Sequence, residues 1–208
     1  MKKQWFTVQK VRPQLYALAE FNHFEKVVSY LVVGKTQAVL FDTGMGYKDI
    51  HKVIRTITKL PVAVFLTHKH WDHIGGVRKT DTVHTWSRDG QKMDIDGFTI
   101  QVIHTPGHTP DSVCYFLKDL NWLFVGDTLY PGPLYAHLPE SDIAAYAQSL
   151  AKLCSFTNKK TLILPGHNAV YTGYTLLKNA ATLMKQAIHA KKAGTKEIKG
   201  DGFSVLLR

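Results

Sequence analysis

The chain has 208 residues, of which 45% are hydrophobic, so it can bury a sizeable core and is not a disordered segment. Its formal net charge of +10 would attract anionic partners, but no nucleic-acid motif or aromatic–basic interleaving accompanies it. No apolar run is long enough for a transmembrane helix, and no apolar stretch follows the basic start. We therefore expect a cytoplasmic protein of one domain, residues 1–208, without a membrane span.

The first half of the chain alternates predicted strands with one helix. Apolar and β-branched runs at 27–33 and 38–42 flank a short polar turn and predict a hairpin. Apolar residues at helical spacing predict a helix over 47–59. A buried strand at 62–66 and a short strand at 82–86 follow.

The second half repeats this order of strands and then helices. Its predicted strands are 98–104, 112–117, 122–125, 161–164 and 203–207. Helices are predicted over 142–153, with Ser141 as the N-cap, and over 174–192. The segment 129–139 is rich in Pro and is expected to form a long irregular loop. The similar halves predict two sheets packed face to face, with helices outside.

The most informative motif lies directly after the strand at 62–66. In the run 68–73 the ligand-type side chains are His68, His70, Asp72 and His73. Imidazole and carboxylate groups are ligands for Zn²⁺ and similar ions. A polar surface loop that happens to be rich in His is the plain alternative.

Three further candidates follow later strands, each beside a glycine. His108 and His167 both come after Pro-Gly, and Asp127 comes after Gly126. Glycine lets the backbone turn sharply and approach a site closely. A lone His after a strand is usually structural, but three such positions added to the first run predict a shared metal site.

With these residues in their order, the chain resembles the metallo-β-lactamase-fold hydrolases of the two-metal type. The resemblance implies an α/β fold, a four-layer αββα sandwich with the site at one edge between the two sheets. It implies that His68, His70 and His108 bind one metal ion, and that Asp72, His73 and His167 bind the second. Asp127 would bridge the two ions. Asp42, in Asp-Thr-Gly after a strand, matches the residue that supports the metal loop.

The use of Asp at the bridge resembles glyoxalase II, lactonases and acyl-thioesterases. The resemblance implies a binuclear zinc hydrolase, with Fe or Mn as alternative metals, in which a metal-bridging hydroxide attacks a thioester, ester or lactone carbonyl. Asp72 and Tyr130 are the predicted catalytic residues, the first orienting the hydroxide and the second facing the carbonyl or product. Tyr135, His137 and Asn168 are candidates near the mouth. The expected partner is a small carbonyl substrate, anionic or phosphorylated to suit the basic surface, and no nucleic acid.

Other functions remain open at this point. The same two-metal core serves phosphodiesterases and nucleases, although no appended nucleic-acid domain is visible in the chain. An iron-dependent redox enzyme is a further alternative; the flavin-coupled relatives of this kind need a second domain and usually carry an acidic residue where His70 stands. A metal-stabilised binding module is the non-enzymatic alternative. The other histidines and both cysteines, Cys114 and Cys154, are interpreted as structural or surface residues.

Overall fold

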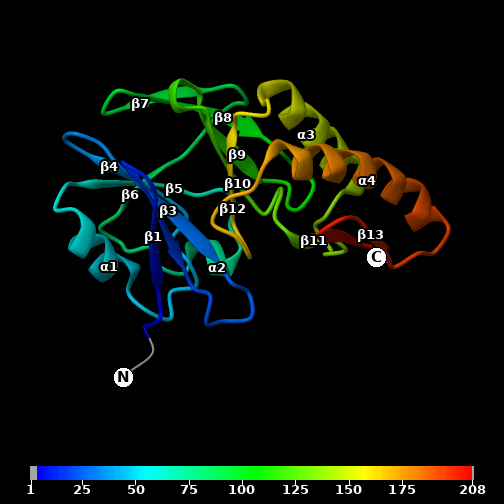
Figure 1. The fold of residues 1–208 in the computed structure, drawn as a ribbon, viewed down its shortest axis with the longest axis horizontal. Coiled ribbons are helices and arrows are strands. Elements are labelled where there is room, and N and C mark those ends of the chain that lie inside the picture. Colours follow the sequence, from blue (N-terminus) through cyan, green and yellow to red (C-terminus); the bar gives the residue numbers. More distant parts are fainter. Residues whose placement is uncertain (1–3, 208) are drawn as a thin grey trace.

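The computed structural model describes residues 4–207 as two β-sheets packed face to face with helices outside, which confirms the predicted fold class (Figure 1). The first sheet runs in the order β1 (Thr7–Arg12), β2 (Leu15–Ala19), β3 (Val28–Val33), β4 (Ala38–Phe41), β5 (Val62–Phe65), β6 (Thr82–His84). The second runs in the order β12 (Leu162–Pro165), β10 (Trp122–Gly126), β9 (Val113–Leu117), β8 (Phe98–His104), β7 (Lys92–Ile95).

The main core lies between the two sheets. Side chains alternate across a strand, so successive residues of β3 separate: Tyr30 and Val32 join the core between the sheets, whereas Leu31 faces outward. In the second sheet Phe124 stacks on Phe41 of the first, with ring centroids 3.8 Å apart. Both rings belong to the core between the sheets.

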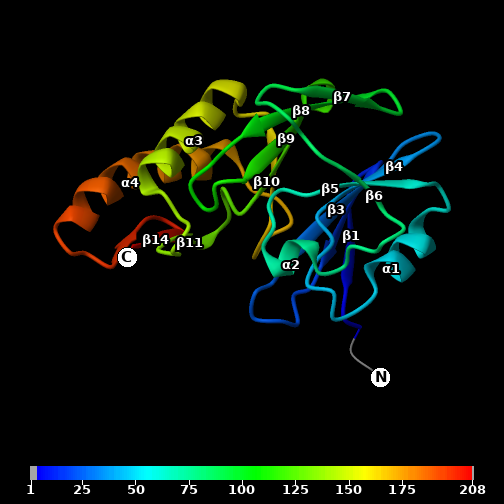
Figure 2. The ribbon, with the colours of Figure 1, turned by 180° about the vertical axis from the view of Figure 1, so that it is seen from behind.

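Helices cover the outer face of each sheet (Figure 2). On the first sheet, α1 (Ile50–Ile57) buries Ile50 and Ile54 against Leu31 and its neighbours. The second sheet is covered by α3 (Ile143–Phe156) and α4 (Tyr174–Lys192), which pack on each other. No helix within residues 4–207 is long and apolar enough to cross a bilayer.

The predicted N-cap of α3 was wrong by one residue. Asp142, not Ser141, is the cap, and its carboxylate accepts hydrogen bonds from the backbone N–H groups of Ala144 at 2.8 Å and Ala145 at 3.0 Å. The Ser141 hydroxyl instead donates to the carbonyl oxygen of His108. An ionised carboxylate is also favoured at the positive end of the helix.

The segment 129–139 is also more regular than predicted. It contains β11 (Gly132–Ala136), which pairs in parallel with β14 (Phe203–Leu207), while β14 pairs antiparallel with β13 (Glu197–Lys199). Because β11 lies at the edge of this three-stranded sheet, its Pro133 can lack an N–H group. The final strand of the chain therefore holds the segment that follows Asp127.

Candidate metal centre

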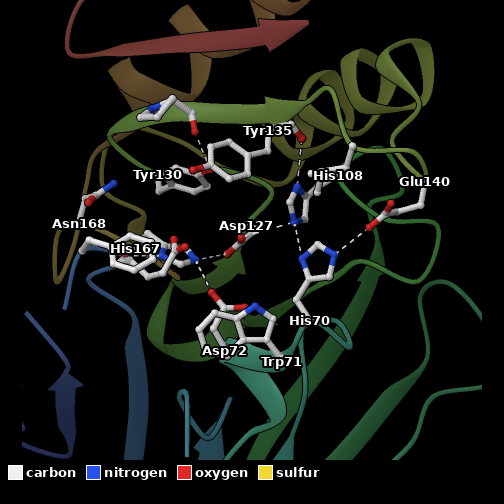
Figure 3. A pocket seen from close by; sticks show the side chains of 14 residues that line it. His70, Trp71, Asp72, His108, Asp127, Tyr130, Tyr135, Glu140, His167 and Asn168 are labelled. Atoms are coloured by element: carbon white, nitrogen blue, oxygen red, sulfur yellow. Dashed lines mark hydrogen bonds and ion pairs between the residues drawn. The ribbon is translucent and has the colours of Figure 1, made fainter. Parts of the chain in front are cut away.

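The predicted ligands meet at one edge of the sandwich, between the two sheets. His68 and His70 lie in the turn after β5, and Asp72 and His73 lie on the short helix α2 (Trp71–Ile74). The other three follow the second sheet's strands: His108 after β8, Asp127 after β10 and His167 after β12. Figure 3 shows five of these side chains, those of His70, Asp72, His108, Asp127 and His167, pointing toward a common space.

The seven residues form two groups of ligand atoms, each within 4.8 Å of one another. The first group is His68, His70, His108 and Asp127; the second is Asp72, His73 and His167. All are buried except His70, which is half-buried. The structure thus brings together every residue of the sequence-based ligand set. The two predicted sets of three fall in separate groups, and Asp127, predicted as a bridge, falls in the first group.

Two histidines have their tautomers fixed by backbone carbonyls. His108 donates from Nδ1 to the carbonyl oxygen of Tyr135 at 3.1 Å, and His167 donates from Nδ1 to that of Glu25 at 2.6 Å. A carbonyl oxygen can only accept, so each neutral ring has a lone pair on Nε2. Both Nε2 atoms face the site.

The other three rings are oriented by side-chain oxygens. His73 Nδ1 lies 2.8 Å from the Asp42 carboxylate, and His70 Nε2 lies 3.1 Å from that of Glu140. His68 Nδ1 lies 3.1 Å from the Thr67 hydroxyl, which donates its own proton to Asp42 and therefore accepts here. In neutral rings the remaining lone pairs, on His73 Nε2, His70 Nδ1 and His68 Nε2, all point inward.

The Asp127 carboxylate faces both groups. Its Oδ1 lies 3.0 Å from His73 Nε2 and 3.1 Å from His167 Nε2, and its Oδ2 lies 3.5 Å from His108 Nε2. Burial alone would raise the pKa of this carboxyl, but His167 and His73 hold it well below its ordinary range. The site therefore keeps an anionic oxygen directed at each group.

The histidines themselves divide by pKa. Burial lowers the pKa of His68 and His108, so both rings are neutral near pH 7. Burial also opposes charge on His73 and His167, but Asp127 outweighs it and raises their pKa. Asp127 therefore favours the protonated, positively charged forms of His73 and His167.

One buried atom supports a metal at this place. His68 Nε2 is buried and has no hydrogen-bond partner among the described residues, although a buried polar atom normally has one. It lies 4.0 Å from Asp127 Oδ2, beyond hydrogen-bond distance. A metal ion accepts such a lone pair, and the all-imidazole and carboxylate donor set suits Zn²⁺.

Asp42 holds the first sheet's part of the site together. It accepts from the backbone N–H of Thr67 at 2.7 Å and from the Thr67 hydroxyl at 2.8 Å, besides its contact with His73. Its backbone is in the left-handed region, with φ of 58°, where Asp is tolerated better than most residues. The predicted support role of Asp42 thus has a direct geometric basis.

Two glycines allow the sheets to approach at the site. A Cβ atom on Gly166 would lie 2.7 Å from Asp127 Oδ1, and one on Gly126 would lie 2.4 Å from the Thr67 hydroxyl oxygen. Both distances are far shorter than carbon–oxygen contacts in proteins. The glycines beside Asp127 and His167 are therefore required for the ligands to converge, as their positions in the sequence predicted.

A cavity of about 340 Å³ opens onto the two groups. Tyr130 lines it with its ring 5.2 Å from that of His167, and its hydroxyl donates to the carbonyl oxygen of Pro133 at 2.6 Å. Tyr135 and Asn168 also line it, whereas His137 packs on Tyr135 with its ring 5.0 Å away.

The sequence did not indicate four residues that line the cavity: Phe24, Glu25, Trp71 and Glu140. Glu140 contacts His70 across 70 positions of the chain, so no local pattern marks it.

The thiol of Cys114 is buried, which raises its pKa to about 11, and Cys154 is half-buried in α3. Neither cysteine lines the cavity.

The fold and the site together define a protein whose His and Asp clusters are able to bind metal ions between two packed sheets. The profile of the metallo-beta-lactamase superfamily matches residues 24–84 and 80–167, more than half of the chain. The chain belongs to this superfamily.

Curated relatives include thioesterases. Human acyl-coenzyme A thioesterase MBLAC2 is 22% identical, over 92% of this chain and 91% of its own length. The lactamase-like protein aptB of Emericella nidulans is 30% identical over 68% of this chain, and the atrochrysone carboxyl ACP thioesterase of Aspergillus chevalieri is 28% identical over 69%. The chain spans about half the length of these last two, 51% and 53%.

Solved structures show the same fold. The metallo-beta-lactamase from Pontibacter korlensis superposes with a TM-score of 0.74 and 21% identity, covering 86% of this chain and 99% of its own. The metallo-beta-lactamase DIM-1 superposes with a TM-score of 0.72 and 21% identity, covering 88% and 99%. At this identity the likeness concerns the fold alone.

Proposed function

We propose that the protein is a binuclear metal-dependent hydrolase that cleaves a thioester, with esters and lactones as chemically related substrates. The observation that carries the proposal is the convergence of five imidazole rings around one buried carboxylate, Asp127. His68, His70 and His108 would hold one ion and Asp72, His73 and His167 would hold the other, with the Asp127 carboxylate facing both groups.

Bound divalent ions would supply a water molecule with a pKa near ~7 and would polarise the substrate carbonyl. The chain's own groups do the rest. Asp72 lines the cavity with its Oδ2 3.6 Å from His167 Nε2, so it is placed to hold a proton during the reaction. Glu140 and Asp42 keep His70 and His73 oriented through hydrogen bonds.

Tyr130 is the proposed contact for the carbonyl or product. Its ring lies against His167 in the cavity wall, and Pro133 fixes the direction of its hydroxyl. Because that hydroxyl donates to Pro133, it can donate to a substrate carbonyl oxygen only after the bond to Pro133 is released. Burial and the nearby Asp127 raise the Tyr130 pKa well above its ordinary value, so the group stays protonated.

The names of the relatives favour the thioester within this class, since MBLAC2 and the atrochrysone carboxyl ACP protein are both thioesterases by name. The test combines metal analysis with turnover. The protein is purified, reconstituted with Zn²⁺, analysed for bound metal by mass spectrometry, and assayed for thiol release from an acyl thioester. We expect two ions per chain and thioester hydrolysis.

The matched variants are His73→Ala and His189→Ala, the latter an exposed histidine of α4. The first should lose metal and activity and the second should keep both. A single ion per chain would overturn the binuclear site. Cleavage of bis(p-nitrophenyl) phosphate without any thioester turnover would instead identify a phosphodiesterase.

A further inference from the structure

A band of exposed aromatic rings leads away from the cavity along the first sheet's side. Trp71 lines the cavity and lies 6.1 Å from Tyr47 between ring centroids. Tyr47 in turn lies 6.0 Å from Trp5. Trp71 is 50% exposed and Tyr47 is 57% exposed. Contiguous exposed aromatic rings beside a cavity mark a binding surface more often than scattered single ones do.

The band ends in a second hollow, of about 390 Å³, which the hydrolytic chemistry does not use. Its apolar wall includes Trp5, Phe6 and Val53, and Tyr47 stands at its edge toward the cavity. Lys48, in the turn before α1, and Lys52, in its first turn, add two cations.

The charge of this second hollow is positive. Asp49 also lines it, but its carboxylate already accepts from Arg78 at 2.5 Å and from the backbone N–H of His51 at 3.1 Å. Among residues 4–207, the ion pairs of Lys and Arg are Arg78–Asp49 and Lys152–Asp89. Lys48 and Lys52 are exposed and therefore available to an anion.

Hydrogen bonds to the buried Glu20 hold the aromatic wall in place. The indole N–H of Trp5 donates to the buried carboxyl of Glu20 at 2.6 Å, and the other oxygen of Glu20 accepts from the backbone of Met45 at 3.0 Å. Met45 belongs to the turn that carries Tyr47. A wall that is already ordered loses little conformational freedom when a ligand binds.

The ligand that suits this surface has a planar aromatic group, several phosphates and a long arm that reaches the cavity. We propose that the second hollow binds the adenine nucleotide of a coenzyme A thioester, with the acyl carbonyl at the metal centre. This rests on the proposed thioester hydrolysis. The base stacks on Tyr47 or Trp5, the phosphates meet Lys48 and Lys52, and the pantetheine arm crosses Trp71.

Direct binding tests the subsite without any turnover. Adenosine 3′,5′-bisphosphate, which carries the nucleotide but no thiol, is titrated into the purified protein by calorimetry. Tyr47→Ala and the double variant Lys48→Glu/Lys52→Glu should each weaken its Kd by about tenfold or more, as stacking and phosphate contacts would. The control Lys92→Glu/Lys118→Glu, with the same charge change on exposed residues of the second sheet's side, should bind as the wild type.

Turnover then separates the subsite from the hydrolytic function. The same acyl group is offered on coenzyme A and on N-acetylcysteamine, which lacks the nucleotide. The Lys48→Glu/Lys52→Glu variant should raise KM for the coenzyme A thioester about tenfold and leave N-acetylcysteamine thioester hydrolysis unchanged.

The outcomes are distinguishable. If neither thioester is hydrolysed, the proposed function fails, and nucleotide binding alone decides the subsite. If the nucleotide does not bind, or binds all variants equally, the subsite is overturned whatever the turnover. A lysine effect confined to an acyl carrier protein thioester would also overturn it and would identify an acidic protein as the partner.

Discussion

The two sheets contribute to the site in different ways. The first sheet supplies four candidate ligands from one short segment, His68 to His73, which Asp42 and Thr67 tie to the end of β4 and β5. The second sheet supplies three, His108, Asp127 and His167, each from the end of a different strand. The first sheet's part of the site is thus a local sequence motif held in place by Asp42 and Thr67. The second sheet's part exists only when β8, β10 and β12 are assembled in one sheet.

The largest effect is expected at Asp127, where the two halves meet. Asp127→Ala removes a side chain that, alone among residues 4–207, contacts His73, His167 and His108 together. We expect bound metal to be lost and kcat/KM to fall by more than about a hundredfold, beyond the range for residues that merely support ligands. Mass spectrometry and thioester assays measure both, and Asp94→Ala on exposed β7 is the control. Unchanged metal content would refute the bridging role.

Asp42→Asn tests how strongly the first sheet's motif depends on its scaffold. An amide nitrogen in place of Oδ2 can accept from neither the His73 ring nor the Thr67 hydroxyl. We expect the free energy of unfolding to fall by about 3 kcal/mol, since a buried charged partner is removed, and metal affinity to fall about 10–100-fold. Urea denaturation and metal competition measure these. A loss of stability without a change in metal affinity would limit Asp42 to a structural role.

Glu140 links the halves from the second sheet's side, and its removal should have a smaller effect. It accepts from His70 Nε2, but its side chain is 39% exposed, so water can replace it. Glu140→Ala should lower metal affinity about tenfold, the low end for a supporting residue, and Glu140→Gln should restore most of it because the amide oxygen still accepts. Equal loss in both variants would mean that charge, and not orientation, is what Glu140 provides.

Tyr130→Phe removes one hydroxyl from the cavity wall. If that hydroxyl contacts the substrate, kcat/KM should fall about fivefold, the value of one hydrogen bond of about 1 kcal/mol. The lost bond to Pro133 should cost a similar amount of stability, which thermal unfolding measures separately. An unchanged kcat/KM would leave Tyr130 as a packed aromatic residue.

The smallest effect is a pH dependence of stability at Glu20, beneath the first sheet's motif. Burial raises the pKa of this carboxyl above its usual value of 4.5. Because the folded state binds the Glu20 proton more tightly than the unfolded state, the protonated Glu20 stabilises the fold. This stabilisation is complete below about pH 4.5 and is lost as pH rises through the folded-state pKa. Glu20→Gln does not titrate, so the stability of the wild type relative to the variant should fall as pH rises from 4 to 7. A pH-independent difference in urea denaturation would contradict this.

Much of the fold was predictable because hydrophobic patterns are local. Strand β8, strand β14 and helix α4 begin and end at the predicted residues. Strand β1 was missed because nearly all of its residues are exposed, which leaves no apolar run to recognise. Strand β11 was missed because Pro133 argues against a strand unless it lies at a sheet edge.

The sequence by itself determined the chemical types of the candidate ligands and their places at strand ends. Both follow from local features, namely residue type and the hydrophobic pattern of neighbouring residues. Only the tertiary structure decided where the lone pairs point. Those directions depend on oxygens distant in sequence, such as Glu140 for His70 and Glu25 for His167. The alignment of Trp71 with Tyr47 and the second hollow likewise arises from the packing of α2 beside the turn before α1, which no local pattern records.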